Sequence, residues 1–253
     1  MKRILILVPH PDDEVVGLCC FIKRQISLGS KVFLFILTNG VIQKDKMWVW
    51  QRKNFDYILK SRNLELKKSL KNLDISKFYK QNIPTRRLRF FLTKTYRKID
   101  QIIQKEKISD LFTPAFEGGH QDHDLANFLA SKFIKKTNVF EFSEYNFSNF
   151  KVKSNKFIEE FGNEVTIELN SKERKFKKKA MEIYLSEKNN LNYINLNRET
   201  YRPLPLYDYF SSPHKGILFY KRFSLFSWHP KVDGTNLNEI KKKMLEFNVS
   251  FSK

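Results

Sequence analysis

The sequence predicts an α/β fold with a Rossmann-like, mostly parallel sheet and helices on both faces. Two continuous apolar runs, residues 4–8 and residues 32–37, are typical of parallel strands covered on both sides. Between them, apolar residues recur at helical spacing from Val15 to Ile26, and Gly29 is placed to end that helix. This strand, helix, strand order predicts a βαβ unit with a right-handed crossover.

The rest of the chain continues the alternation of helices and short strands. Helical spacing predicts further helices over residues 50–73, 91–105, 123–135 and 171–187. Short apolar or alternating runs predict strands over residues 110–113, 138–143 and 165–169. After residue 189 the periodicity weakens, and residues 201–230 mix Pro, Tyr, Phe, Lys and Arg. We therefore expect an irregular aromatic and basic C-terminal region.

Length and composition favour one cytoplasmic domain over residues 1–253. With 41% hydrophobic and 15% aromatic residues the chain has enough apolar side chain for a core, which excludes a disordered or fibrous protein. The apolar runs are far shorter than the roughly 20 residues of a spanning helix, and the first is broken too early for a signal peptide. Cys19 and Cys20 are adjacent and cannot supply a disulfide framework, which fits a reducing compartment.

The net charge of +20 has two interpretations. An excess of 47 Lys and Arg over 27 Asp and Glu is typical of proteins that bind nucleic acid, membrane surfaces or acidic substrates. The abundance of Lys, Asn, Phe, Ile and Tyr also fits the coding bias of an AT-rich gene. Composition alone leaves both interpretations open.

Two clusters of imidazole and carboxylate groups follow predicted strands. His10, Asp12, Asp13 and Glu14 come after the first strand, and residues 120–124 (His-Gln-Asp-His-Asp) come after the strand at 110–113. Since the carboxyl ends of parallel strands meet at one edge of a sheet, we expect the two clusters to meet. Imidazole with carboxylate suits zinc, and catalytic zinc sites use three protein ligands and a water. Either cluster alone is a weak pattern, but the pair is specific.

The paired motifs resemble those of the PIG-L/LmbE family of zinc-dependent N-acetyl-sugar deacetylases, which includes de-N-acetylases of glycosylphosphatidylinositol, mycothiol and bacillithiol synthesis. Further matches are Thr38-Asn39-Gly40, Arg62-x-x-Glu65-Leu66, and Lys179-Ala180 followed by Tyr184-x-Ser186, although Glu187 stands where a glutamine is usual. The resemblance covers about residues 1–190 and leaves 190–253 as a variable extension. Residues 83–87 (Ile-Pro-Thr-Arg-Arg) replace an acidic family segment, a departure that concerns the substrate.

The resemblance implies a zinc deacetylase with one Zn2+ per chain. Its motif positions make His10, Asp13 and His123 the metal ligands. Asp12 is then the general base for a metal-activated water, whose pKa falls towards about 7. His120 is expected to stabilise the tetrahedral oxyanion or to protonate the leaving amine.

Other motif residues receive supporting roles. We expect Glu14 to cap the following helix, and Asp122 and Asp124 to orient histidines. Arg62 and Asn39 are candidates for substrate binding, with a pair between Arg62 and Glu65 as the alternative for the arginine.

Four aromatic residues outside the motifs are expected to be structural. Trp48 and Trp50 are assigned to core packing, with a sugar subsite as the alternative. His214 and His229 are single histidines, which are more often structural than functional.

The resulting hypothesis is a zinc-dependent amidase that removes acetyl from an N-acetylamino sugar in a glycoconjugate, such as a lipid-linked or nucleotide-linked cell-envelope sugar. The alternative is a nucleic-acid-binding or anionic-surface-binding protein, in which aromatics interleave with Arg202, Lys215, Lys221 and Arg222. Its weakness is that the charge is spread without a recognisable nucleic-acid module, so we expect no nucleic-acid partner. A dinucleotide-binding enzyme is excluded because no G-x-G-x-x-G follows the first strand. The basic C-terminal region also suits a peripheral contact with the anionic inner face of the membrane.

Overall fold

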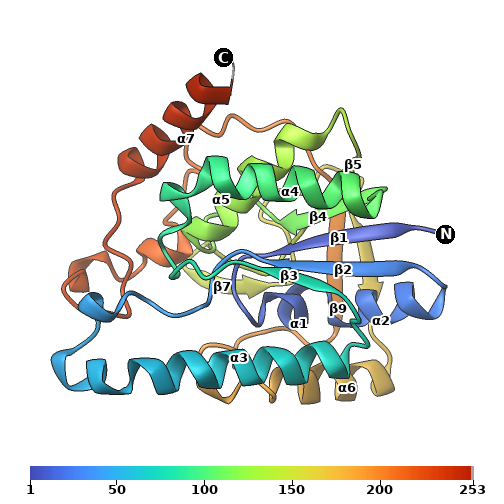
Figure 1. Ribbon diagram of the computed structural model, residues 1–253, viewed down its shortest axis with the longest axis horizontal. Coiled ribbons are helices and arrows are strands. Elements are labelled where there is room, and N and C mark those ends of the chain that lie inside the picture. The colour runs from blue at the N-terminus through green and yellow to red at the C-terminus, as the bar shows by residue number, and fades with distance from the viewer. Residues whose placement is uncertain (252–253) are drawn as a thin grey trace.

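A seven-stranded sheet forms the centre of the molecule (Figure 1). The structure is a computed structural model that describes residues 1–251. The strands of this sheet are β1 (Arg3–Val8), β2 (Lys31–Ile36), β3 (Phe78–Lys80), β4 (Asp110–Pro114), β5 (Asn138–Phe142), β8 (Val165–Glu168) and β9 (Arg198–Pro203). Their order is β3-β2-β1-β4-β5-β9-β8, in which β1 to β5 are parallel and β9 is antiparallel to both of its neighbours. The predicted mostly parallel α/β sheet is confirmed. A separate hairpin comprises β6 (Tyr145–Ser148) and β7 (Lys151–Ser154).

Helices cover both faces of the sheet, as expected. One face carries α1 (Asp13–Gly17), α2 (Cys19–Ser27), α3 (Phe55–Asn72) and α6 (Ser171–Met181) (Figure 1). The other face carries α4 (Leu92–Glu106), α5 (Gln121–Ala130) and α7 (Leu237–Phe251) (Figure 1). Successive side chains of β1 enter two different cores, since Leu5 and Leu7 pack on the side of α4 and α5 and Ile6 on the side of α1 and α2. No helix within residues 1–251 is long and apolar enough to cross a membrane.

The first predicted helix is divided into α1 and α2, which was not foreseen. Gly17 lies against the ring of Phe142, where a Cβ atom would come within 2.4 Å of a ring carbon. At the start of α2, the carboxylate of Glu199 accepts hydrogen bonds from the backbone N–H groups of Cys20 and Phe21. A carboxylate satisfies free N–H groups at a helix start, so a residue of β9 supplies the cap that the local sequence lacks.

The region after residue 189 contains a strand, β9, and an α-helix, α7, that the sequence pattern did not reveal. β9 is hidden because charged residues occupy its buried positions: Glu199 pairs with the fully buried Lys177 at 3.0 Å, and Arg202 pairs with Glu141 at 2.7 Å. α7 packs against α4 at the edge of the same face. The placement of Arg202 in a nucleic-acid-binding surface was therefore wrong, because this side chain is buried in the sheet.

Candidate active site

The two predicted clusters meet at the carboxyl edge of the sheet. β1 pairs in parallel with β4, so the segments that follow both strands emerge side by side. His10 follows β1, and His120 precedes α5 on the segment that follows β4. Their imidazole rings lie edge to face with centroids 4.4 Å apart.

Three side-chain atoms converge as a metal site requires. Oδ2 of Asp13 lies 3.3 Å from Nδ1 of His10 and 3.3 Å from Nε2 of His123, and these two nitrogens are 3.2 Å apart. Ligands at roughly 2.0–2.1 Å from a tetrahedral zinc are about 3.3–3.4 Å from one another. The triangle has this size, all three residues are buried, and the donor types are those that zinc prefers.

Asp122 and Asp13 prepare this centre for positive charge. Burial alone would lower the pKa of His10, but the carboxylates of Asp13 and Asp122 raise it to about 10. Oδ2 of Asp122 lies 3.1 Å from Nε2 of His10 and also accepts the backbone N–H of Arg86 at 2.7 Å. When the proton of the neutral His10 ring is on Nε2, beside Asp122, the lone pair of Nδ1 is free to bind a metal held by the three converging atoms. Asp122 thus orients a histidine, as expected.

Asp124 and Glu14 hold the loops around the site. The carboxylate of Asp124 accepts the N–H of Gly118 at 3.0 Å, and within residues 1–251 no hydrogen bond or ion pair joins it to a histidine, in contrast to the orienting role expected of it. Glu14 is fully buried and accepts the N–H of Asp12 at 3.0 Å, which agrees with its expected role at the helix start. It also accepts hydrogen bonds from the hydroxyl groups of Ser69 and Tyr184.

His120 is placed as a neutral hydrogen-bond donor. It caps α5, where its Nδ1 accepts the backbone N–H of Asp122 at 3.0 Å. The ring proton therefore sits on Nε2. Burial, together with the nearby imidazole of His10, lowers the pKa of His120 well below its usual value.

Asp12 is the N-cap residue directly before α1, and its backbone is strained, with φ 127°. Its Oδ1 lies 3.5 Å from Nη2 of Arg62, which is itself buried in α3. Burial raises the pKa of Asp12 well above its usual range, and the guanidinium of Arg62 opposes this effect. Arg62 also donates hydrogen bonds to Ser186 Oγ at 3.1 Å and to the carbonyl of Pro11.

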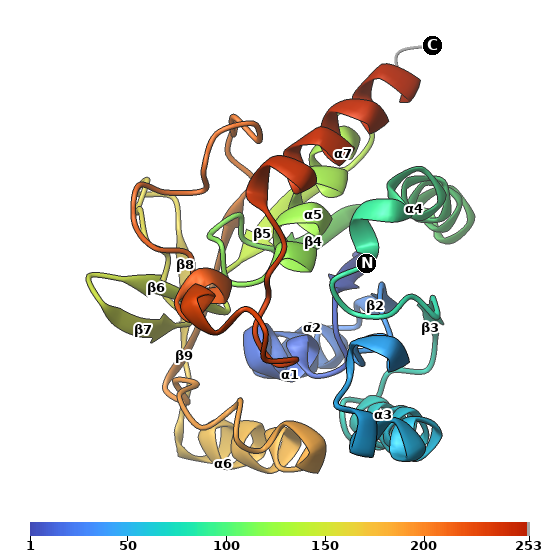
Figure 2. The same ribbon diagram turned by 90° about the vertical axis from the view of Figure 1, so that its left-hand side faces the viewer.

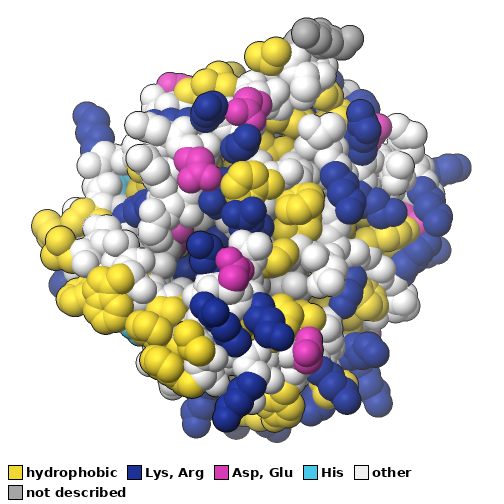
Figure 3. All heavy atoms as spheres, turned by 60° about the vertical axis from the view of Figure 1, so that its left-hand side comes forward, with side chains coloured by type: hydrophobic (Ala, Val, Ile, Leu, Met, Phe, Trp, Pro, Cys, Tyr) yellow, Lys and Arg dark blue, Asp and Glu magenta, His cyan; other side chains and the backbone are white. Residues whose placement is uncertain are grey.

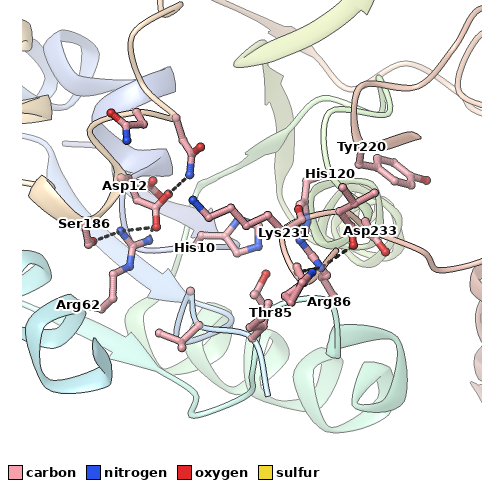
Figure 4. A pocket seen from close by; sticks show the side chains of 18 of the residues that line it. His10, Asp12, Arg62, Thr85, Arg86, His120, Ser186, Tyr220, Lys231 and Asp233 are labelled. Carbon is pink, nitrogen blue, oxygen red and sulfur yellow. Dashed lines mark hydrogen bonds and ion pairs between the residues drawn. The ribbon is translucent and has the colours of Figure 1, made fainter. Parts of the chain in front are cut away.

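A cavity of about 910 Å³ opens over these groups (Figure 4). His10, Asp12, Asp13, His120 and Arg62 line it, as Figure 4 shows for most of them. His123 does not line the cavity. Its Nε2 lies behind the wall, next to Oδ2 of Asp13 and Nδ1 of His10. His123, Asp13 and Arg62 are nearly completely buried.

Asn39 does not line the cavity, in contrast to its expected role in substrate binding. Its side-chain amide donates to Asn82 Oδ1 at 3.0 Å, and its carbonyl oxygen accepts the N–H of Val41 at 3.0 Å. The match to the Thr-x-Gly pattern therefore shapes the loop, and Gly40 and Val41 form the wall of the cavity. A substrate in the cavity would therefore meet Gly40 of this motif and the adjacent Val41, and not the side chain of Asn39.

The C-terminal region contributes to the outer wall of the cavity, and the sequence did not indicate how this region is attached there. The guanidinium of Arg86 donates hydrogen bonds to the carbonyl groups of Pro230, Lys231 and Val232. Arg86 thereby holds residues 230–232 beside His120. Tyr220 lines the same part of the cavity (Figure 4). The departure of residues 83–87 from the family pattern drew attention to Arg86. It gave no indication that Arg86 contacts a segment more than a hundred residues away.

Glu144 is a site residue that the sequence analysis missed. Its Oε2 lies 3.6 Å from Nδ1 of His123, and neither of its oxygens has a hydrogen-bond partner among the described residues. Burial and the charge of Asp13 raise its pKa well above the usual range. The signal was available, because Glu144 follows β5 at the same edge of the sheet.

The aromatic residues near the cavity differ from expectation. Trp48 and His229 line the cavity and contact each other edge to face, whereas His214 is not in its wall. Trp50 is 64% exposed, so its assignment to core packing was wrong.

Comparison with known proteins identifies the family and the fold. The family profile of GlcNAc-PI de-N-acetylase (PIG-L) matches residues 5–134, which is just over half of the chain. A diacetylchitobiose deacetylase from Thermococcus kodakarensis is 30% identical over 140 residues, which make up 53% of this chain and 49% of that protein. The chain therefore spans about half the length of this curated relative.

Solved structures share the fold at low identity. The zinc-inhibited form of a teicoplanin deacetylase aligns with 82% of this chain and 99% of its own, with a TM-score of 0.66 and 17% identity. A 4-carboxy-2-hydroxymuconate hydratase from Pseudomonas putida aligns with 82% of this chain and 98% of its own, with a TM-score of 0.57 and 14% identity. Since these similarities show the fold alone, the assignment rests on the profile, which contains both motifs: the chain belongs to the GlcNAc-PI de-N-acetylase (PIG-L) family.

Proposed function

We propose that this protein is a zinc-dependent hydrolase that removes the acetyl group from an N-acetylamino sugar. The observation that carries the proposal is the triangle of His10, Asp13 and His123, whose size fits one tetrahedral Zn2+ with a position left open. Zinc held there lowers the pKa of water and polarises the carbonyl of an amide.

The protein's own groups would handle the protons and the developing charge. Asp12 lies beside the metal ligand Asp13 in the cavity wall, where it accepts a proton from the attacking water. Arg62 holds this carboxylate in place through their ion pair. The Nε2–H of His120 is directed by the capping bond at Nδ1 and donates to the oxyanion, while the proton taken by Asp12 is available for the leaving amine.

We propose that the sugar is joined to a phosphate, as in lipid-linked or nucleotide-linked precursors. Arg222 and Lys231 line the cavity, and neither forms an ion pair with any residue in the described range 1–251. Such cations favour an anionic group beside the sugar. The adjacent Cys19 and Cys20 are free thiols, which supports the proposal of a cytoplasmic protein.

The same fold in a hydratase means that fold alone does not select the reaction. The proposal is tested by measuring metal content together with acetate release from a panel of UDP-linked, thiol-linked and lipid-linked N-acetyl sugars. One equivalent of zinc, loss of acetate release on chelation and recovery on adding zinc support it. Full activity in verified metal-free protein contradicts it, and tight, salt-dependent binding of DNA or RNA without hydrolysis favours the binding-protein alternative.

A further inference from the structure

All three tryptophans of the chain lie on one surface beside the mouth of the cavity. Trp48 and Trp50 belong to the segment around the 3-10 helix Val49–Asn54, and Trp228 follows the 3-10 helix Ser224–Phe226. The ring of Trp48 stacks on Trp50 at a centroid distance of 5.0 Å and lies 6.0 Å from the ring of Trp228. Two segments far apart in sequence thus build one aromatic surface.

This surface is extensively exposed. We call it the aromatic platform, which consists of Trp48, Trp50, Phe223, Leu225, Phe226 and Trp228. Leu225 is 90% exposed and Trp228 is 68% exposed, and Figure 3 shows hydrophobic side chains gathered at the lower left of this face. Soluble proteins rarely expose a contiguous apolar patch of this kind unless it contacts a partner.

The two segments of the platform are strongly basic. Residues 42–54 carry four Lys or Arg and one acid, and residues 214–232 carry four Lys or Arg and no acid. Figure 3 shows Lys and Arg side chains around the apolar patch. An apolar centre with a cationic border is complementary to a partner that is apolar inside and anionic at its surface.

We propose that the aromatic platform docks this protein on an anionic lipid bilayer. Tryptophan rings settle at the level of the lipid headgroups, and each Lys or Arg near an anionic bilayer strengthens binding by about fivefold. Leu225 lies in the short 3-10 helix Ser224–Phe226 and is almost fully exposed, as a side chain that enters the acyl region would be. A bilayer fits this surface better than nucleic acid does, because an exposed leucine gains nothing from phosphates or bases.

The platform is continuous with the cavity, since Trp48 and Phe223 line both. In Figure 1 the orange-red segment around residues 219–230 lies at the left, on the same side of the molecule as the carboxyl ends of β1 and β2, and this side faces the viewer in Figure 2. Docking therefore turns the mouth of the cavity towards the bilayer. The inference concerns the surface itself and requires no step of the proposed deacetylation.

The experiment uses intrinsic tryptophan fluorescence, which reports on the platform alone because it holds every tryptophan of the chain. The full chain is titrated at low salt with vesicles of phosphatidylglycerol and phosphatidylcholine, and with vesicles of phosphatidylcholine alone. We expect a blue shift and quenching by brominated acyl chains with the anionic vesicles. Binding should weaken as the Debye length shortens from roughly 30 Å at 0.01 M to about 8 Å at 0.15 M salt.

Matched variants distinguish binding through the aromatic platform from non-specific adsorption of the protein to vesicles. Leu225→Ser should lower the vesicle partition coefficient about tenfold, because one buried leucine is lost. The control is Leu28→Ser: this leucine is 77% exposed but lies between α2 and β2, at the opposite edge of the sheet. Lys46→Gln and Lys53→Gln, both outside the cavity wall, should lower binding about fivefold each, whereas Lys31→Gln at the start of β2 should not.

Several outcomes overturn the proposal. One is the absence of a blue shift with anionic vesicles at the lowest salt, and another is equal loss of binding in Leu225→Ser and Leu28→Ser. A blue shift that appears on raising protein concentration without lipid, with a matching increase in mass by light scattering, means that a second copy covers the platform. A blue shift with DNA and none with vesicles assigns the platform to nucleic acid.

Discussion

The guanidinium of Arg62 lies 3.5 Å from the carboxylate of Asp12, at the point where α3 meets the loop after β1. The same guanidinium lies 3.4 Å from Glu187, and the pair with Glu65 that was the alternative for this arginine is longer, at 3.9 Å. Arg62 therefore joins the proposed general base to the segment after α6, and it does so while buried. Arg62 therefore stabilises the contact between these segments and also positions the carboxylate of Asp12.

We expect Arg62→Leu to lower the free energy of unfolding by about 3–5 kcal/mol, because it leaves the buried carboxylate of Asp12 and the half-buried carboxylate of Glu187 without their cation. Chemical denaturation at neutral pH measures this loss. The control is Arg24→Leu, which breaks the more exposed ion pair with Glu173 and should cost about 1 kcal/mol or less. Equal losses in the two variants contradict a special role for Arg62.

The adjacent residues Asp12 and Asp13 should respond differently to substitution. Asp13→Ala removes one corner of the ligand triangle and should lower zinc occupancy, whereas Asp12→Asn should keep zinc and lose most of the rate. The expected loss for Asp12→Asn is about 100- to 10,000-fold in kcat, because an amide cannot accept the proton. Metal analysis and acetate release on the same samples decide it. Equal loss of zinc in both variants would mean that the roles of the two aspartates are wrongly assigned.

Gly119 controls the position of His120. A Cβ atom on Gly119 would lie 2.5 Å from the backbone carbonyl oxygen of Tyr145, which cannot move without shifting β6. We expect Gly119→Ala to displace the loop and to lower kcat at least tenfold, while Asp13 and His10 still bind zinc. The control is Gly234→Ala, whose Cβ would have no atom nearer than 3.6 Å and should leave the rate unchanged. An unchanged rate in Gly119→Ala contradicts the tight placement of this loop.

The site could be predicted from the sequence because its residues follow strands, and local patterns find strands. The apolar runs at residues 4–8 and 110–113 predict strands that place His10 and His120 at one edge of a parallel sheet. β9 could not be predicted in the same way. Its buried positions hold Glu199 and Arg202, and only partners distant in sequence neutralise them.

The attachment of the outer wall could not be predicted for a related reason. The attachment of residues 230–232 to Arg86 uses backbone carbonyl groups, which leave no trace in the side-chain pattern. The aromatic platform shows the same limit, since Trp48 and Trp228 meet only in the folded chain. The sequence shows that each segment is basic and aromatic. It does not show that the two segments lie side by side.

Glu117 should make the stability of the fold depend on pH. Its carboxylate is buried beside Asn146 and the backbone N–H of Ile158, and burial raises its pKa to about 7 from an ordinary 4.5. Between these two values the folded chain holds a proton that the unfolded chain has released. The stabilisation from this group is therefore complete below about pH 4.5 and is lost as the pH rises through about 7.

The variant Glu117→Gln stays neutral at all pH values and should remove this dependence. The difference in free energy of unfolding between wild type and variant should shift by roughly 3 kcal/mol against the wild type from about pH 4.5 to pH 8. The control is Glu164→Gln. Hydrogen bonds from the N–H of Phe161 and from Arg202 overcome the effect of burial and lower the pKa of Glu164 to about 2, so its carboxylate is already ionised throughout this range in the fold. Its difference from wild type should therefore stay nearly constant above about pH 5, and a constant difference for Glu117→Gln as well would show that Glu117 is ionised in the native protein.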